Sequence, residues 1–127
     1  MDKCDFWERF MTALIAGDSA KLELMLDPDF FLVEADGLPY GGTYRGVQGC
    51  LDLGAAIGKT WKGYSARRLE FVSETDDSLV IRLALAGTSR KTGVTFETTL
   101  LEVWRFKGEK LSEILPYYWD TQLLSAG

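Results

Sequence analysis

The chain has 127 residues, 46% of them hydrophobic, so it is long enough for one globular domain with a core and an internal pocket. Its formal net charge is −5 and no run of lysine or arginine is present, which argues against nucleic acid as a partner. The chain contains no histidine and no asparagine. Their absence excludes Ser-His-Asp and Cys-His catalysis, imidazole metal sites and any mechanism in which an asparagine amide orients water.

The N-terminal residues Met1–Asp5 lack the apolar segment of a secretory signal, and no apolar run is long enough to span a bilayer. Cys4 and Cys50 are too few for a disulfide framework, and we expect both to be reduced thiols that are buried or half-buried. We therefore expect one soluble, cytoplasmic domain over residues 1–127, with no membrane partner, no metal and no cofactor.

The first half of the chain is predicted to be mainly helical. Apolar residues recur at helical spacing over Phe6–Ala16 and again over Ser19–Leu26, where Asp27-Pro28 ends the second helix. Phe30–Glu34 is typical of a short strand, and the glycine- and tyrosine-rich residues 36–46 predict a structured loop.

A third helix is predicted over Val47–Trp61, although Gly49, Gly54 and Gly58 lower its intrinsic propensity. Gly58-Lys59-Thr60 resembles the end of a phosphate-binding loop, but Leu53 stands where that motif needs its first glycine. We therefore do not predict nucleotide binding.

The second half of the chain is predicted to be a sheet. Four β-like runs are separated by short connections, which imply antiparallel neighbours. The runs are Ser65–Thr75, Ser78–Gly87, Val94–Lys107 and Lys110–Trp119. A helical turn is expected over Asp120–Leu124.

Glu102 is the one acid on an otherwise largely apolar face of the third of these strands. Side chains of a strand alternate between its two faces. The even-numbered face consists of Val94, Phe96, Thr98, Leu100, Glu102, Trp104 and Phe106. If that face is buried, Glu102 must be paired, protonated or hydrogen-bonded.

Glu34 ends the first predicted strand and, like Glu102, lies at the edge of a predicted apolar face. Two such carboxyls from distant parts of the chain are candidates for an acid/base pair with different pKa values. The alternative is that Glu34 is solvated, while Glu102 makes a structural hydrogen bond or an ion pair with an arginine such as Arg82.

Aromatic residues gather near the end of the last strand, where residues 115–120 hold three of them next to an acid. Packing in the core with polar tips at the surface is one interpretation, and an aromatic wall facing a ligand is the other. The candidate ligand-binding residues are Phe10, Phe31, Tyr44, Trp61, Trp104, Tyr118, Trp119 and Asp120.

Four segments carry a resemblance to a known superfamily. They are Arg9–Asp18 with its Ala-Gly-Asp junction, Leu38–Gly46, Val103–Phe106 with Gly108 and Lys110, and Tyr117–Thr121. In order and spacing they resemble the nuclear transport factor 2-like (NTF2-like) superfamily, in particular its SnoaL-like and ketosteroid-isomerase-like members.

The resemblance implies an α+β cone, in which a curved antiparallel sheet wraps around about three helices from the N-terminal half and encloses an apolar cavity. It also implies a homodimer formed through the outer face of the sheet. By alignment with the family's motifs, Glu34 falls at the position of the isomerases' base and Glu102 at that of their protonated acid. The implied ligand is a small apolar carbonyl compound.

The chain also departs from the isomerases. Phe10 stands where they have an oxyanion-binding tyrosine, and both acids are glutamate instead of aspartate, which makes steroid isomerisation unfavourable. If the protein is an enzyme, Glu34 would remove a proton α to a carbonyl, while neutral Glu102 and a tyrosine, Tyr44 or Tyr118, would stabilise the oxyanion. The alternatives are a ligand-binding or dimeric module without turnover and a protein-interaction adaptor.

Overall fold

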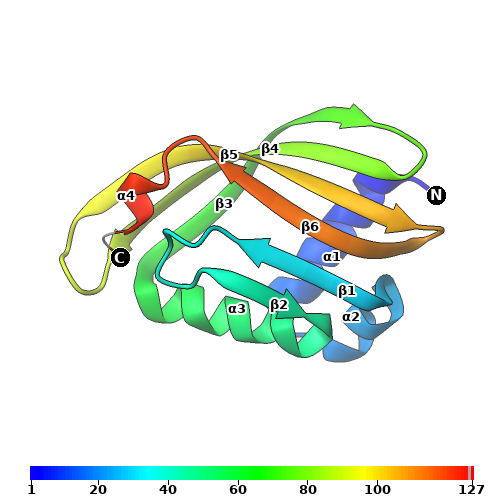
Figure 1. Cartoon of the computed structure of the whole chain (residues 1–127), viewed down its shortest axis with the longest axis horizontal. Coiled ribbons are helices and arrows are strands. Elements are labelled where there is room, and N and C mark those ends of the chain that lie inside the picture. The colour runs from blue at the N-terminus through cyan, green and yellow to red at the C-terminus, as the bar shows by residue number, and fades with distance from the viewer. Residues whose placement is uncertain (126) are drawn as a thin grey trace.

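The computed structural model describes residues 1–125 and 127, and within them the chain forms helices and strands in the order shown in Figure 1. The elements are α1 (Lys3–Ala16), α2 (Ser19–Met25), β1 (Leu26–Glu34), β2 (Gly42–Arg45), α3 (Gly46–Thr60), β3 (Trp61–Glu74), β4 (Ser78–Ser89), β5 (Thr95–Lys107), β6 (Lys110–Tyr118) and α4 (Gln122–Ser125). The predicted α+β class is confirmed. The predicted helices lie within one or two residues of their observed bounds, except that α1 begins three residues earlier, at Lys3.

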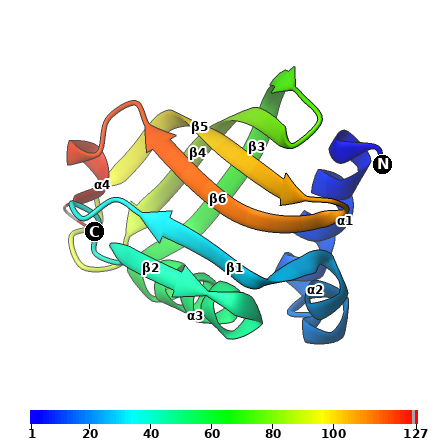
Figure 2. The ribbon, with the colours of Figure 1, turned by 45° about the vertical axis from the view of Figure 1, so that its right-hand side comes forward.

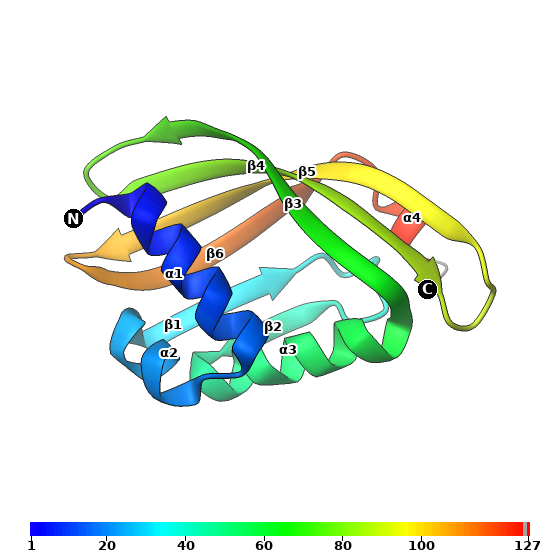
Figure 3. The ribbon, with the colours of Figure 1, turned by 180° about the vertical axis from the view of Figure 1, so that it is seen from behind.

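The strands form one open, curved sheet in the order β2-β1-β6-β5-β4-β3. Figure 2 shows how the sheet bends, and Figure 3 shows α1 crossing in front of it with α3 along its lower part. The sheet is mixed, not wholly antiparallel as predicted, because β1 runs parallel to β6 and pairs Leu32 with Ile114. Short hairpins impose antiparallel pairing only on consecutive strands, and β1 and β6 are joined by most of the chain.

A short strand lies inside the predicted loop of residues 36–46. Strand β2 pairs antiparallel with β1 and sets Gly42 opposite Glu34. It has only four residues, one of them glycine, which leaves too little alternation to indicate a strand from the sequence. Pairing with β1 therefore decides its conformation.

Strand β3 begins at Trp61, four residues before its predicted start, and contains an early β-bulge. Lys62 pairs with Thr88 and Ser65 with Ala86, so β3 has one more residue than β4 across this interval. Gly63 has a φ of 63°, the left-handed conformation that glycine adopts most readily in such bulges. The extra residue shifts the inward face from Trp61 to Tyr64 and Ala66.

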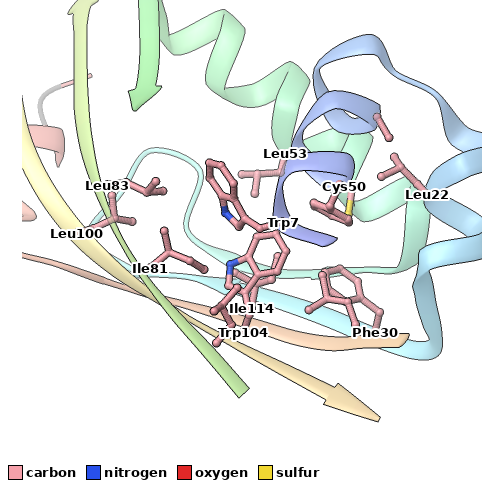
Figure 4. Packing of buried hydrophobic residues seen from close by; sticks show 14 of the residues in the cluster. Trp7, Leu22, Phe30, Cys50, Leu53, Ile81, Leu83, Leu100, Trp104 and Ile114 are labelled. Carbon is pink, nitrogen blue, oxygen red and sulfur yellow. The ribbon is translucent and has the colours of Figure 1, made fainter. Parts of the chain in front are cut away.

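The core lies between the concave face of the sheet and helices α1 and α3 (Figure 4). The predicted alternation along β5 is confirmed, since Phe96, Leu100, Trp104 and Phe106 are all buried. The ring of Phe10 on α1 meets that of Trp104 edge-on, with 5.1 Å between centroids. Aromatic contacts of this kind fix the helix against the sheet.

Two further expectations concern the cysteines and the membrane. Cys50 is buried and Cys4 half-buried, and both are free thiols as predicted. None of the helices in the described part of the chain is both long and apolar enough to cross a membrane.

Candidate functional site

A pocket of about 140 Å³ lies between α1, α3 and the concave face of the sheet. Its walls are mostly apolar, with Phe10, Met11 and Leu14 from α1 and Leu53 and Ile57 from α3. The residues that line it include two acids and two tyrosines, but no lysine and no arginine. The pocket therefore combines apolar walls with two carboxyl groups, two phenol hydroxyls, the Trp104 indole and the Cys50 thiol.

Glu34 reaches the pocket from the C-terminal end of β1 and is only 4% exposed. The Tyr118 hydroxyl donates a 2.7 Å hydrogen bond to Glu34 Oε1. Burial raises the pKa of Glu34 to about 7; the Tyr118 hydrogen bond opposes the shift and the charge of Glu102 adds to it. Glu34 can thus gain or lose a proton near neutral pH.

Glu102 lines the same pocket from β5 and is half-buried. Trp104, two residues further on the same face, donates from Nε1 to Glu102 Oε1 at 3.1 Å. Burial raises the pKa of Glu102 to about 7, and the indole hydrogen bond opposes the shift. Of the alternatives for this acid, a hydrogen bond to Trp104 is observed.

The sheet register brings the two acids to one region of the pocket. Glu102 pairs with Pro116 of β6, and the parallel ladder of β1 and β6 ends at Leu32 and Ile114, two residues before Glu34 and Pro116. Glu34 and Glu102 therefore flank the middle strand, two interstrand spacings or roughly 10 Å apart along the sheet. Both side chains face the pocket, so a small ligand could contact both.

Tyr64 also lines the pocket, and sequence reasoning missed it. Among the described residues, no group hydrogen-bonds its hydroxyl. Burial raises the pKa of that hydroxyl, and Tyr40, Glu102 and Glu34 raise it further, so the hydroxyl is within electrostatic reach of both acids. Gly63 was the signal in the sequence that could have indicated Tyr64, because a glycine inside a strand often marks a bulge, and a bulge changes which side chains face inward.

Comparison with known proteins identifies the fold. A scan against protein-family models gives no match, and neither does a search of curated proteins. Among solved structures, an NTF2-like protein from Burkholderia thailandensis E264 has a TM-score of 0.78 and 27% identity, over 91% of this chain and 88% of that chain. This chain therefore has the fold of the NTF2-like superfamily.

Two neighbours of lower sequence identity have the fold alone in common with this chain. A hypothetical protein from Catenulispora acidiphila DSM 44928, of ketosteroid isomerase-like fold and in complex with trimethylamine, has a TM-score of 0.69 and 16% identity, over 86% of this chain and 81% of that chain. A putative SnoaL-like polyketide cyclase from Jannaschia sp. CCS1 has a TM-score of 0.74 and 10% identity, over 98% of this chain and 92% of that chain.

Three of the eight candidate ligand-binding residues line the pocket of this NTF2-like chain. They are Phe10, Trp104 and Tyr118. The other five lie elsewhere, namely Phe31, Tyr44, Trp61, Trp119 and Asp120. Side chains of consecutive residues in an extended chain lie on opposite faces, and Tyr118 and Trp119 follow this rule. Tyr118 faces the pocket, and Trp119 is 85% exposed.

Each of the other four outlying residues has a local structural partner. Phe31 is half-buried, and the Arg45 guanidinium lies 5.7 Å from its ring centroid. The Tyr44 hydroxyl donates to the Tyr40 carbonyl at 2.7 Å. Trp61 is buried and donates from Nε1 to the Tyr40 hydroxyl at 2.9 Å. Asp120 Oδ1 accepts from the backbone N–H of Gln122 at 2.9 Å.

Proposed function

We propose that the pocket binds a small, apolar carbonyl compound and that Glu34 and Glu102 act on it as an acid/base pair. The observation that carries the proposal is that both carboxyls line one apolar pocket and have pKa values of about 7. Near neutral pH such a pair holds about one proton, so a carboxylate and a carboxylic acid face the same ligand.

The volume of the pocket limits the ligand. An apolar cavity of about 150 Å³ accommodates benzene, and this pocket has about 140 Å³. A compound with one ring or a short branched chain therefore fits, whereas a four-ring skeleton does not. The complex of the Catenulispora neighbour with trimethylamine, also a small organic molecule, is consistent with this size class.

The two acids are assigned different roles by their hydrogen bonds. Glu34 accepts a phenolic O–H at 2.7 Å, whereas Glu102 accepts an indole N–H at 3.1 Å, and the shorter bond stabilises an anion more. In the proposed step Glu34 takes a proton from the carbon α to the carbonyl. The electron pair moves to the carbonyl oxygen, which neutral Glu102 stabilises by donating a hydrogen bond. Return of the proton completes an isomerisation or an exchange.

Exchange of α-hydrogens in a small ketone tests this step directly. Cyclohexanone in D2O, followed by NMR, should gain deuterium at its α-carbons faster with the wild-type protein than with buffer. Glu34→Gln should lose this acceleration, because an amide cannot take the proton. If the wild-type protein is no faster than the Glu34→Gln variant, the catalytic assignment is wrong, and binding without turnover becomes the better hypothesis.

We also propose that the protein forms a homodimer through the outer face of the sheet, which would suit either an enzyme or a non-catalytic module. A groove of about 590 Å³ on that face is lined by exposed apolar residues from three strands and the segment after β6, together with Glu70, Arg82 and Thr99. Among them are Val72, Leu101, Tyr117 and Trp119, which are 48%, 38%, 59% and 85% exposed. Exposed apolar patches of this kind typically mark interaction surfaces.

A further inference from the structure

We propose that the Tyr64 hydroxyl donates a hydrogen bond to the ligand's carbonyl oxygen, beside the one from neutral Glu102, and that the pocket consequently selects an uncharged ketone or aldehyde. This inference rests on the proposed function and names a residue and a ligand class for it. Phe10, on the first helix, offers no donor in this pocket.

Apart from the carboxyl of neutral Glu102, the other N–H and O–H donors around the pocket are already engaged. The Tyr118 hydroxyl donates to Glu34, and the Trp104 indole donates to Glu102. Tyr44 donates to a backbone carbonyl outside the pocket. Tyr64 is half-buried in the pocket wall, and in the described part of the chain no group accepts from its hydroxyl. A hydroxyl group can donate only one hydrogen bond, so Tyr118 and Tyr44 have no donor left for a ligand, whereas Tyr64 has one.

The bulge in β3 gives Tyr64 this position. Without the extra residue between Lys62 and Ser65, the alternation that starts at buried Trp61 would direct Gly63 inward and Tyr64 outward. Gly63 absorbs the bulge in the left-handed conformation. β-Bulges commonly re-aim a side chain next to a binding site, and here the re-aimed side chain is the phenol that lines the pocket.

The surrounding charges define what Tyr64 can bind. Burial and the nearby acids raise the pKa of its hydroxyl, so it stays protonated and remains a donor at physiological pH. Because the lining residues include two acids and no basic side chain, a carboxylate or phosphate ligand would be repelled and would lack a counter-charge. A neutral carbonyl oxygen satisfies the phenol without adding charge.

A matched pair of ligands isolates this contact. Cyclohexanone and methylenecyclohexane have nearly the same shape, but only the ketone can accept a hydrogen bond. Their affinities are measured for the wild-type protein, Tyr64→Phe and the control Tyr117→Phe, which removes a hydroxyl from the outer face. The ¹³C shift of the labelled carbonyl in the bound ketone is recorded as well, since hydrogen bonding moves it downfield.

At pH 9, where Glu102 is ionised and cannot donate, the wild type and Tyr117→Phe should prefer the ketone by roughly three- to tenfold, the range expected for one neutral hydrogen bond. Tyr64→Phe should abolish this preference and the carbonyl shift, while binding methylenecyclohexane unchanged. If Tyr64→Phe keeps the preference and the shift, the assignment of Tyr64 is wrong although the proposed function stands. If the wild type shows no preference, or binds neither compound, both the assignment and the proposed ligand class are wrong.

Discussion

Tyr118 and Glu34 are 84 residues apart in the chain, and the Tyr118 hydroxyl donates a 2.7 Å hydrogen bond to Glu34 Oε1 in the wall of the pocket. The bond connects the last strand to the end of β1, just beyond the point where the ladder between the two strands stops. The bond therefore extends the contact between the two strands beyond the end of their ladder, and it stabilises the ionised form of a buried acid.

Removing this donor should destabilise the protein most when Glu34 is ionised. We expect Tyr118→Phe to lower the free energy of unfolding by about 2 kcal/mol at pH 8, the magnitude of a hydrogen bond to a charged group, and by less at pH 5. Urea denaturation at the two pH values measures both. Tyr117→Phe, on the outer face, is the control and should change stability by less than about 0.5 kcal/mol. Equal losses at both pH values would contradict the role assigned to Tyr118.

The pH dependence of stability follows from the raised pKa values of the two acids, which are about 7 in the folded protein against 4.5 ordinarily. The folded state holds these protons more tightly than the unfolded state. The two acids therefore do not lower the stability of the fold below pH 4.5. They lower it increasingly between pH 4.5 and pH 7, and by a constant amount above pH 7. The free energy of unfolding of Glu34→Gln, relative to that of the wild type, should therefore rise by up to roughly 3 kcal/mol between pH 5 and pH 8. The exposed Glu97→Gln serves as the control and should show no such gain.

Because the Trp104 indole donates to Glu102, two substitutions of Glu102 should differ in their effect on stability. At pH 5, where Glu102 is neutral, Glu102→Gln should leave stability nearly unchanged because the amide oxygen still accepts from Trp104 Nε1. Glu102→Leu leaves that N–H without an acceptor and should cost about 1 to 3 kcal/mol. Thermal denaturation compares them. A leucine variant as stable as the glutamine variant would mean that the indole hydrogen bond contributes nothing.

Two glycines of α3 should respond differently to alanine. A Cβ on Gly49 would lie 2.7 Å from the Tyr44 backbone carbon, whereas a Cβ on Gly54 would meet nothing within 4 Å. We expect Gly49→Ala to destabilise the protein by about 1 to 3 kcal/mol through overpacking against β2. Gly54→Ala should stabilise it by up to about 1 kcal/mol through helix propensity. If both variants gain stability, α3 does not pack this closely on β2.

The proposed homodimer can be tested at Trp119. Trp119→Ser removes the most exposed large aromatic side chain of the outer-face groove, and sedimentation equilibrium should then show a weaker dimer than for the wild type. Val94→Ser is a suitable control, since Val94 is 64% exposed but does not line the groove. A wild-type protein that remains monomeric at high concentration would contradict the proposal.

Local patterns predicted the parts of this fold that depend on local chemistry. The alternation along β5 identified Leu100 and Trp104 as core residues and Glu102 as the acid among them, because the period of a strand needs no knowledge of its partner. Glycine adopts the left-handed conformation that ends a helix, as Gly17 does at the end of α1, and this too depends on local chemistry alone.

The remaining features depend on pairing between distant segments. Whether β1 runs parallel or antiparallel to β6 is decided by the path of the whole chain, which no local pattern contains. The bulge at Gly63 is defined by the register against β4, and a shift of one residue decides whether Tyr64 faces the pocket or the solvent. Likewise, Trp61 was predicted to contact the ligand, but it is buried outside the pocket and donates to the hydroxyl of Tyr40, 21 residues away in the chain.

The most direct test of the account is the titration of the glutamate carboxyls, observed by ¹³C NMR on protein labelled at glutamate Cδ. We predict that two carboxyl signals titrate near pH 7, and that Glu34→Gln and Glu102→Gln each remove one of them. If every glutamate titrates near its ordinary pKa of about 4.5, the pocket does not hold a neutral acid beside a carboxylate, and the proposed acid/base pair is contradicted.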